Sequence, residues 1–177
     1  MKKFELTSEF VTFLGKKLFR IKALISFGNV KEGELGGYVE KEENLDQSGD
    51  AWVYGNARVY GNAWVSGDAR VYGNAWVSGD AEVYGNAWVS GNAEVSGNAE
   101  VSGDADYATV HGFGSEYRTT TFFRTKAGDI GVRCGCFYGT LDDFRKKVKE
   151  THGDSKTAKE YLMVADLMEF RFSEEEV

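Results

Sequence analysis

The chain has 177 residues, a formal net charge of −7 at pH 7, no proline and two cysteines. This length fits one elongated domain with end caps or two small domains, and two cysteines do not make a disulfide scaffold. The acidic balance argues against binding to duplex nucleic acid. We find no apolar run long enough to cross a membrane and no secretory signal, so we expect a cytoplasmic protein that does not bind membranes.

The chain opens with a predicted β-hairpin. Residues 9–14 and 17–24 read as strands on either side of a turn at Gly15. We therefore assign residues 1–34 to an N-terminal hairpin cap. Its candidate buried side chains are Phe10, Phe13, Phe19 and Ile21.

An imperfect first coil is predicted before the regular repeats begin. Val39 and Leu45 are six residues apart, but eight residues separate Leu45 from Val53. This spacing predicts a two-residue insertion at a corner. Atypical terminal repeats are expected because the open end of a solenoid must be capped.

A six-residue repeat then fills the centre of the chain. Valine recurs every six residues from Val53 to Val101, and an alanine precedes each valine by two positions. Residues two apart on a strand share a face, so Ala and Val point to one side and the residue between them to the other. Tyr or Ser follows, and then Gly with Asn or Asp, the residues that adopt positive φ most cheaply. The pattern predicts a mainly β solenoid over residues 35–110, with short strands around a narrow interior.

The repeat resembles the hexapeptide-repeat family of left-handed parallel β-helices. The variant GNA(R/W/E)V(Y/S) also looks like repeats in small uncharacterised proteins of bacteria and their phages. The resemblance implies a left-handed triangular coil of eighteen residues. It also implies a possible activity, because the best-known enzymes of the family are acyltransferases with a catalytic histidine. His111 is the candidate general base for this alternative, with Glu116 as the orienting acid.

A coil of eighteen residues would stack outward side chains in columns, in which successive coils lie about 4.8 Å apart. One column holds Trp52, Arg70 and Trp88, flanked by Tyr54 and Tyr72. Trp, Tyr and Arg dominate binding hot spots, and monomers seldom leave a continuous aromatic surface exposed. We predict that a second copy of the chain, a partner protein or a planar ligand covers these residues. The alternative is that the terminal segments of the same chain cover them, and the sequence leaves both open.

Residues 111–177 are predicted to form a small α+β cap. Residues 118–125 and 130–137 read as a second hairpin, and helices are expected after Thr140 and Ser155. Arg118, Arg124 and Arg133 are further candidate contacts for a protein or a small anionic ligand.

Metal and cofactor sites are not predicted. Cys134, Cys136, His111 and His152 are zinc-type ligands, but they lack the closely spaced pairs of a zinc motif. We interpret the two cysteines as small core side chains.

The overall expectation is a non-enzymatic binding or scaffolding protein of a bacterial or phage-infected cell, assembled as a homo-oligomer. If the chain is encoded by a phage, it would act in counter-defence by sequestering a host protein or a nucleotide signal.

Overall fold

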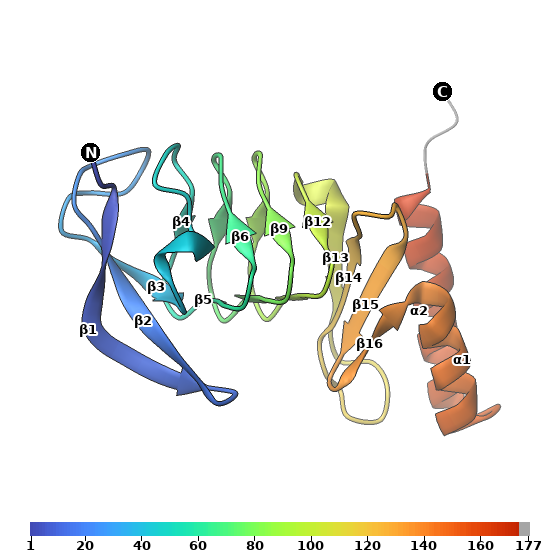
Figure 1. Ribbon diagram of the computed structural model, residues 1–177. Helices are drawn as coiled ribbons and strands as arrows, with labels where there is room; N and C mark the ends of the chain where they lie inside the picture. The colour runs from blue at the N-terminus through green and yellow to red at the C-terminus, as the bar shows by residue number, and fades with distance from the viewer. Residues whose placement is uncertain (174–177) are drawn as a thin grey trace.

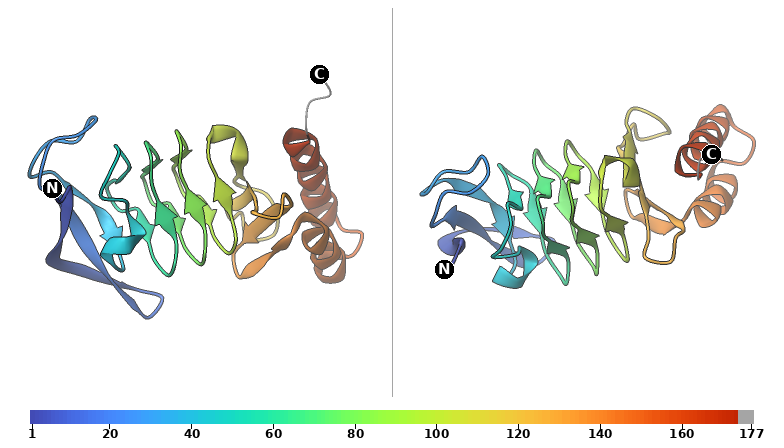
Figure 2. Two further views of the ribbon diagram at one scale, coloured as in Figure 1. Left: turned by 45° about the horizontal axis from the view of Figure 1, so that its top comes forward. Right: turned by 90° about the horizontal axis from the view of Figure 1, so that it is seen from above.

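A parallel β-solenoid of about four turns lies between two caps in the computed structural model, which describes residues 1–173 (Figure 1). The last four residues of the predicted 111–177 segment are outside this part. The N-terminal hairpin and the C-terminal helices lie at opposite ends of the molecule, and the coils stack between them (Figure 2). Within residues 1–173, no helix is long and apolar enough to cross a membrane.

The solenoid strands each contain two residues, and strands eighteen residues apart pair in parallel. Trp52 pairs with Arg70, and Arg70 pairs in turn with Trp88, as the predicted column requires. The strands are β4 (Trp52–Val53), β5 (Arg58–Val59), β6 (Trp64–Val65), β7 (Arg70–Val71), β8 (Trp76–Val77), β9 (Glu82–Val83), β10 (Trp88–Val89), β11 (Glu94–Val95) and β12 (Glu100–Val101).

The interior contains the predicted side chains. Every repeat valine from Val53 to Val101 is fully buried, and so are the alanines that precede them. At the corners, the glycines from Gly49 to Gly97 adopt positive φ, with Gly79 at +69° as an example, whereas no corner Asn or Asp does. One residue without a Cβ is enough to turn the chain, so the following residue keeps an ordinary conformation.

The irregular first coil contains the predicted insertion. Leu45 bridges Val65, twenty residues away, whereas Val53 pairs with Val71, eighteen residues away. The two additional residues therefore lie between Leu45 and Val53.

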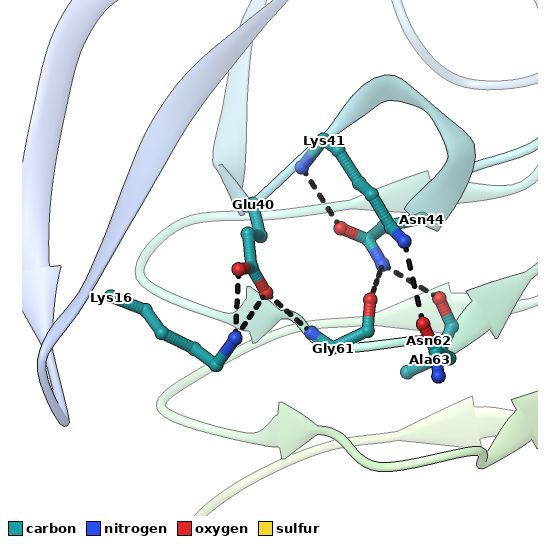
Figure 3. A network of polar contacts seen from close by, with 7 residues as sticks. All are labelled: Lys16, Glu40, Lys41, Asn44, Gly61, Asn62 and Ala63. Carbon is teal, nitrogen blue, oxygen red and sulfur yellow. Dashed lines mark hydrogen bonds and ion pairs between the residues drawn. The ribbon is translucent and has the colours of Figure 1, made fainter.

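Asn44 fastens this coil to the next one (Figure 3). It ends the short 3-10 turn η1 (Glu42–Asn44), in which its backbone N–H bonds to the Lys41 carbonyl. Its buried side-chain amide donates to the carbonyls of Gly61, at 3.1 Å, and Ala63, at 2.8 Å. Its Oδ1 accepts a bond from the Lys41 N–H at 3.0 Å. The side-chain amide of Asn44 thus donates the inter-coil hydrogen bonds that the backbone N–H groups of η1 do not make.

Glu40 connects the hairpin to the same corner. Lys16 Nζ donates to its carboxylate at 2.7 Å, and the Gly61 N–H donates to it at 2.6 Å (Figure 3). The hydrogen bond from Lys16 is the main reason that the pKa of Glu40 lies below its ordinary value.

The N-terminal hairpin is longer than predicted and continues a solenoid sheet. Antiparallel strands β1 (Phe4–Phe13) and β2 (Lys16–Ala23) join β3 (Leu35–Val39), which pairs in parallel with β5. Of the four predicted core residues only Ile21 is buried, and Phe10 is 48% exposed. Phe10 lies beside the Phe19 ring and under the Lys17 ammonium.

The C-terminal cap is an antiparallel sheet of four strands with two helices. The strands are β13 (Tyr107–Val110), β14 (Thr120–Arg124), β15 (Ile130–Cys134) and β16 (Phe137–Thr140). A turn at Gly135, with φ of +58°, divides the single strand predicted over 130–137, so Cys136 lies in that turn instead of on the strand. The helices are α1 (Leu141–His152) and α2 (Lys156–Phe172), capped by Thr140 and Ser155 as predicted.

Strand β14 closes the end of the solenoid. Phe123 packs into the solenoid core, whereas its neighbour Phe122 packs against α1 through Phe144. Alternation along one strand therefore joins the two hydrophobic cores.

Candidate binding surface on the solenoid

The predicted aromatic column forms, with its members in contact. The Arg70 guanidinium lies 5.0 Å from the centre of the Trp88 ring. Tyr72 makes edge-to-face contacts with Tyr54, at 6.3 Å, and with Trp88, at 6.2 Å. Burial raises the pKa of Tyr54 above its ordinary value, although Arg70 opposes this effect. These contacts hold the side chains in fixed orientations.

Trp52 is the exception, because the N-terminal cap covers it completely. Its ring packs edge-on against Phe27, at 5.4 Å, and Phe4, at 6.2 Å. Its buried indole Nε1 has no hydrogen-bond partner within residues 1–173. The prediction that Trp52 is available for binding was therefore wrong, since the alternative of cover by the same chain applies to this residue. Nothing in the local spacing of Phe4 or Phe27 indicated that they would reach the first coil.

The neighbouring column is also partly covered by the N-terminal hairpin. Phe13 packs on Trp76 at 4.8 Å and under the Arg58 guanidinium at 4.4 Å. Two exposed tryptophans remain on the solenoid, Trp64 at 41% and Trp88 at 45%.

A cavity of about 330 Å³, which we call the solenoid hollow, lies beside Trp88. Its lining residues come from two coils and from the start of β13, and they are Tyr72, Trp88, Ser90, Asp104, Tyr107, Ala108 and Thr109. The Tyr107 hydroxyl donates to the Trp88 carbonyl, and Asp104 accepts the Trp88 N–H at 3.0 Å. Tyr107 and Asp104 thus form hydrogen bonds with the backbone groups of Trp88 that a further coil would otherwise pair with. Tyr107 could not be predicted from the repeat, because the six-residue pattern has already faded at its position.

Two of the three arginines predicted as contacts in the C-terminal cap form ion pairs within the chain. Arg133 pairs with Glu94 of the solenoid at 3.3 Å, and Arg124 pairs with Asp106 at 3.3 Å. Burial is the main reason that the pKa of Glu94 is raised, although Arg133 favours its charged form. Arg124 also donates to the carbonyl of Phe172 at the end of α2. Neither side chain lines the solenoid hollow.

Arg118 differs from the other two, because its side chain is half exposed and its one ion pair among the described residues is with Glu116, at 3.8 Å. The exposed His111 lies 3.2 Å from the Thr119 hydroxyl through Nδ1. Among the hydrogen bonds and ion pairs of residues 1–173, none joins His111 to Glu116. The orienting contact expected for an acyltransferase is thus not formed in this structure.

The four zinc-type ligands do not form a metal site. Cys134, Cys136 and His152 line one cavity in the C-terminal cap, and His111 is not among its lining residues. Within the described residues, no three His, Cys, Asp or Glu side chains are grouped to hold a metal ion.

The comparisons with known proteins concern the repeats. A family model described as the YdcK beta solenoid repeat matches residues 51–67, 63–79 and 69–85. No curated protein matches the chain. The central coils are therefore similar to a β-solenoid repeat family, over a stretch that includes Tyr54, Arg70 and Tyr72 but ends before Trp88.

Proposed function

We propose that the chain is a non-enzymatic binding or scaffolding protein that recognises a partner protein through the surface around the solenoid hollow. The observation that carries this proposal is the exposed Trp88 beside Tyr72 and Tyr107, next to a cavity of about 330 Å³. The chain covers Trp52 and part of Trp76 with its own hairpin, but it leaves this aromatic group partly exposed.

The chemistry of the surface favours a partner with both apolar and polar groups. Trp88 and Tyr72 offer rigid apolar rings, and Arg70 supplies a cation directly against Trp88. Fixed aromatic side chains lose little conformational entropy on binding, which is one reason that they dominate hot spots. Asp104 contributes a carboxylate to the lining of the hollow, so a partner cation would complement it.

Two matched tryptophans test this proposal. Trp88→Ala removes the centre of the surface, and Trp64→Ala removes a tryptophan of nearly equal exposure from another column. Each variant and the unchanged protein would be used to capture partners from a bacterial lysate, with identification by mass spectrometry. We expect a partner that is retained by Trp64→Ala and lost with Trp88→Ala. Identical capture by all three proteins would show that the surface does not bind.

We also propose that the chain assembles as a homo-oligomer through α2. This helix exposes an apolar stripe in which Met163, Leu167 and Phe170 are 72%, 57% and 79% exposed. Asp166 and Glu169 of this helix are already paired with Arg145 of α1, at 2.8 Å and 2.7 Å, so the apolar stripe carries the proposal. An antiparallel pair of α2 helices would bury both stripes.

Light scattering tests the oligomer. We expect the molecular mass to fall to that of one chain in Leu167→Glu but to remain unchanged in Arg70→Ala/Tyr72→Ala. A dimer that survives Leu167→Glu, or a monomeric unchanged protein, would contradict assembly through α2. Loss of the dimer only in the Arg70/Tyr72 variant would place a second copy on the solenoid surface instead.

We propose a left-handed coil of the hexapeptide-repeat type and a cytoplasmic location in bacteria. In a phage, the same surface would serve counter-defence by sequestering a host protein or, with a base stacked on Trp88 beside Arg70, a nucleotide signal. The acyltransferase alternative ranks second, because its support is the resemblance of the repeat and the place of His111 just beyond the last coil.

A further inference from the structure

The C-terminal cap contains a second cavity, of about 240 Å³, which we call the cap cavity. It lies between the turn that joins β15 to β16, the loop that precedes β14, and the two helices. It shares no lining residue with the solenoid hollow.

One wall of the cap cavity is aromatic and aliphatic. Phe144 lies 5.6 Å from Phe137 and 5.6 Å from Tyr161, in tilted and edge-to-face geometry, and Val148 continues the wall one turn along α1. An aromatic ring that enters this space would meet both the faces and the edges of other rings, which are the arrangements that such pairs prefer.

The rim of the same cavity carries more positive than negative charge. Arg118 and Lys147 contribute cations, His152 contributes an imidazole, and Glu116 is the one carboxylate among the lining residues. The contact of Arg118 with Glu116 is long, at 3.8 Å, and both side chains are more than half exposed. The Arg118 guanidinium is therefore free to make a shorter, charge-assisted bond with an anion.

Close packing fixes the walls of the cavity in place. A Cβ atom at Gly114 would overlap the hydroxyl of Tyr161, and one at Gly135 would overlap a terminal nitrogen of Arg118. Burial raises the pKa of Tyr161 to about 12. A site that is already formed loses less entropy when a ligand binds.

We propose that the cap cavity binds a small aromatic carboxylate, with its ring against Phe144 and Val148 and its carboxylate at Arg118. The volume is below the range of about 300–1,000 Å³ typical of pockets for drug-sized ligands, which limits the ligand to a single ring with a short acidic arm. This site is independent of the partner surface on the solenoid.

The probe for the test is 3-phenylpropanoate, titrated into the whole chain labelled with ¹⁵N. We expect saturable shifts of amide signals in α1 and around Gly135, with a dissociation constant below about 1 mM. The neutral 3-phenylpropanamide keeps the ring but lacks the charge, so we expect it to bind about tenfold more weakly. Acetate keeps the charge but lacks the ring and should not bind measurably.

Variants separate this site from general anion binding. Arg118→Gln should weaken binding of the acid about tenfold and leave binding of the amide unchanged. Arg171→Gln is the matched control, since it removes an exposed arginine of α2 that does not line the cavity. Val148→Phe should abolish binding by filling the space, but Arg118→Gln decides the test because it leaves the core intact.

Three results would overturn the proposal. These are an absence of saturable shifts with 3-phenylpropanoate up to about 10 mM, equal affinities for the acid and the amide, and an affinity for the acid that Arg118→Gln leaves unchanged.

Discussion

Replacement of Asn44 by alanine should destabilise the solenoid far more than replacement of an exposed corner asparagine. The Asn44 side chain makes three hydrogen bonds with backbone groups of its own coil and the next coil. Asn74 occupies a regular corner and is exposed, and within residues 1–173 its side chain hydrogen-bonds only to Asn92, at 3.5 Å. Asn74→Ala therefore serves as the matched control, because the same atoms are removed from an exposed site.

The magnitude follows from the groups left without partners. Asn44→Ala deprives the carbonyls of Gly61 and Ala63 of one donor each and the N–H of Lys41 of its acceptor. Each buried group that loses its partner costs about 1–3 kcal/mol, and water can reach part of this corner, so we expect a total near 3 kcal/mol. At about 2–4 °C per kcal/mol for a chain of this size, the melting temperature should fall by about 6–12 °C.

Thermal unfolding followed by circular dichroism would measure the difference. Asn74→Ala should change the melting temperature by less than about 2 °C, since surface substitutions usually alter stability by under 0.5 kcal/mol. Asn44→Asp is a second probe, because a carboxylate keeps the acceptor for Lys41 but cannot donate to two carbonyls. It should be destabilised at pH 7 and recover partly in acid, where protonation restores one donor. Equal losses in Asn44→Ala and Asn74→Ala would refute the assigned role of the buried amide.

Three further predictions concern other parts of the chain. Gly79→Ala should lower the melting temperature more than Gly91→Ala. Both glycines have φ near +68°, but a Cβ at Gly79 would lie 2.8 Å from the next coil, whereas Gly91 faces open space. Equal decreases in the melting temperature would assign the whole effect to backbone strain. Burial lowers the pKa of Lys3 from 10.5 to about 8, so the unfolded chain binds more protons between these values. The stability of the protein relative to Lys3→Met, measured by urea unfolding, should therefore rise from pH 8 to 10.5, and a constant difference would contradict the assigned pKa. Thr140→Ala should cost about 1 kcal/mol in the same assay because α1 loses its N-cap, whereas Thr140→Ser should cost little.

The repeat specified the solenoid because its signal is local and recurs in every coil. Ala and Val two positions apart define an inner face, and glycine supplies the positive φ that each corner needs. The helix caps at Thr140 and Ser155 were predictable for the same reason, because each depends on bonds within one turn of chain.

The candidate sites depend on contacts between distant segments. The sequence placed Trp52, Arg70 and Trp88 in one column, but the cover of Trp52 comes from Phe4 and Phe27 and could not be inferred from the column itself. In the same way, no repeat pattern indicated that Tyr107 would reach the Trp88 carbonyl.

Periodicity alone thus determined which side chains point into the solenoid and which point out of it. The tertiary structure decided which of the outward side chains stay exposed, which arginines form ion pairs with carboxylates of the same chain, and where cavities remain. The physical reason is that the direction of a side chain is a property of its own strand, whereas its exposure depends on where the terminal segments pack.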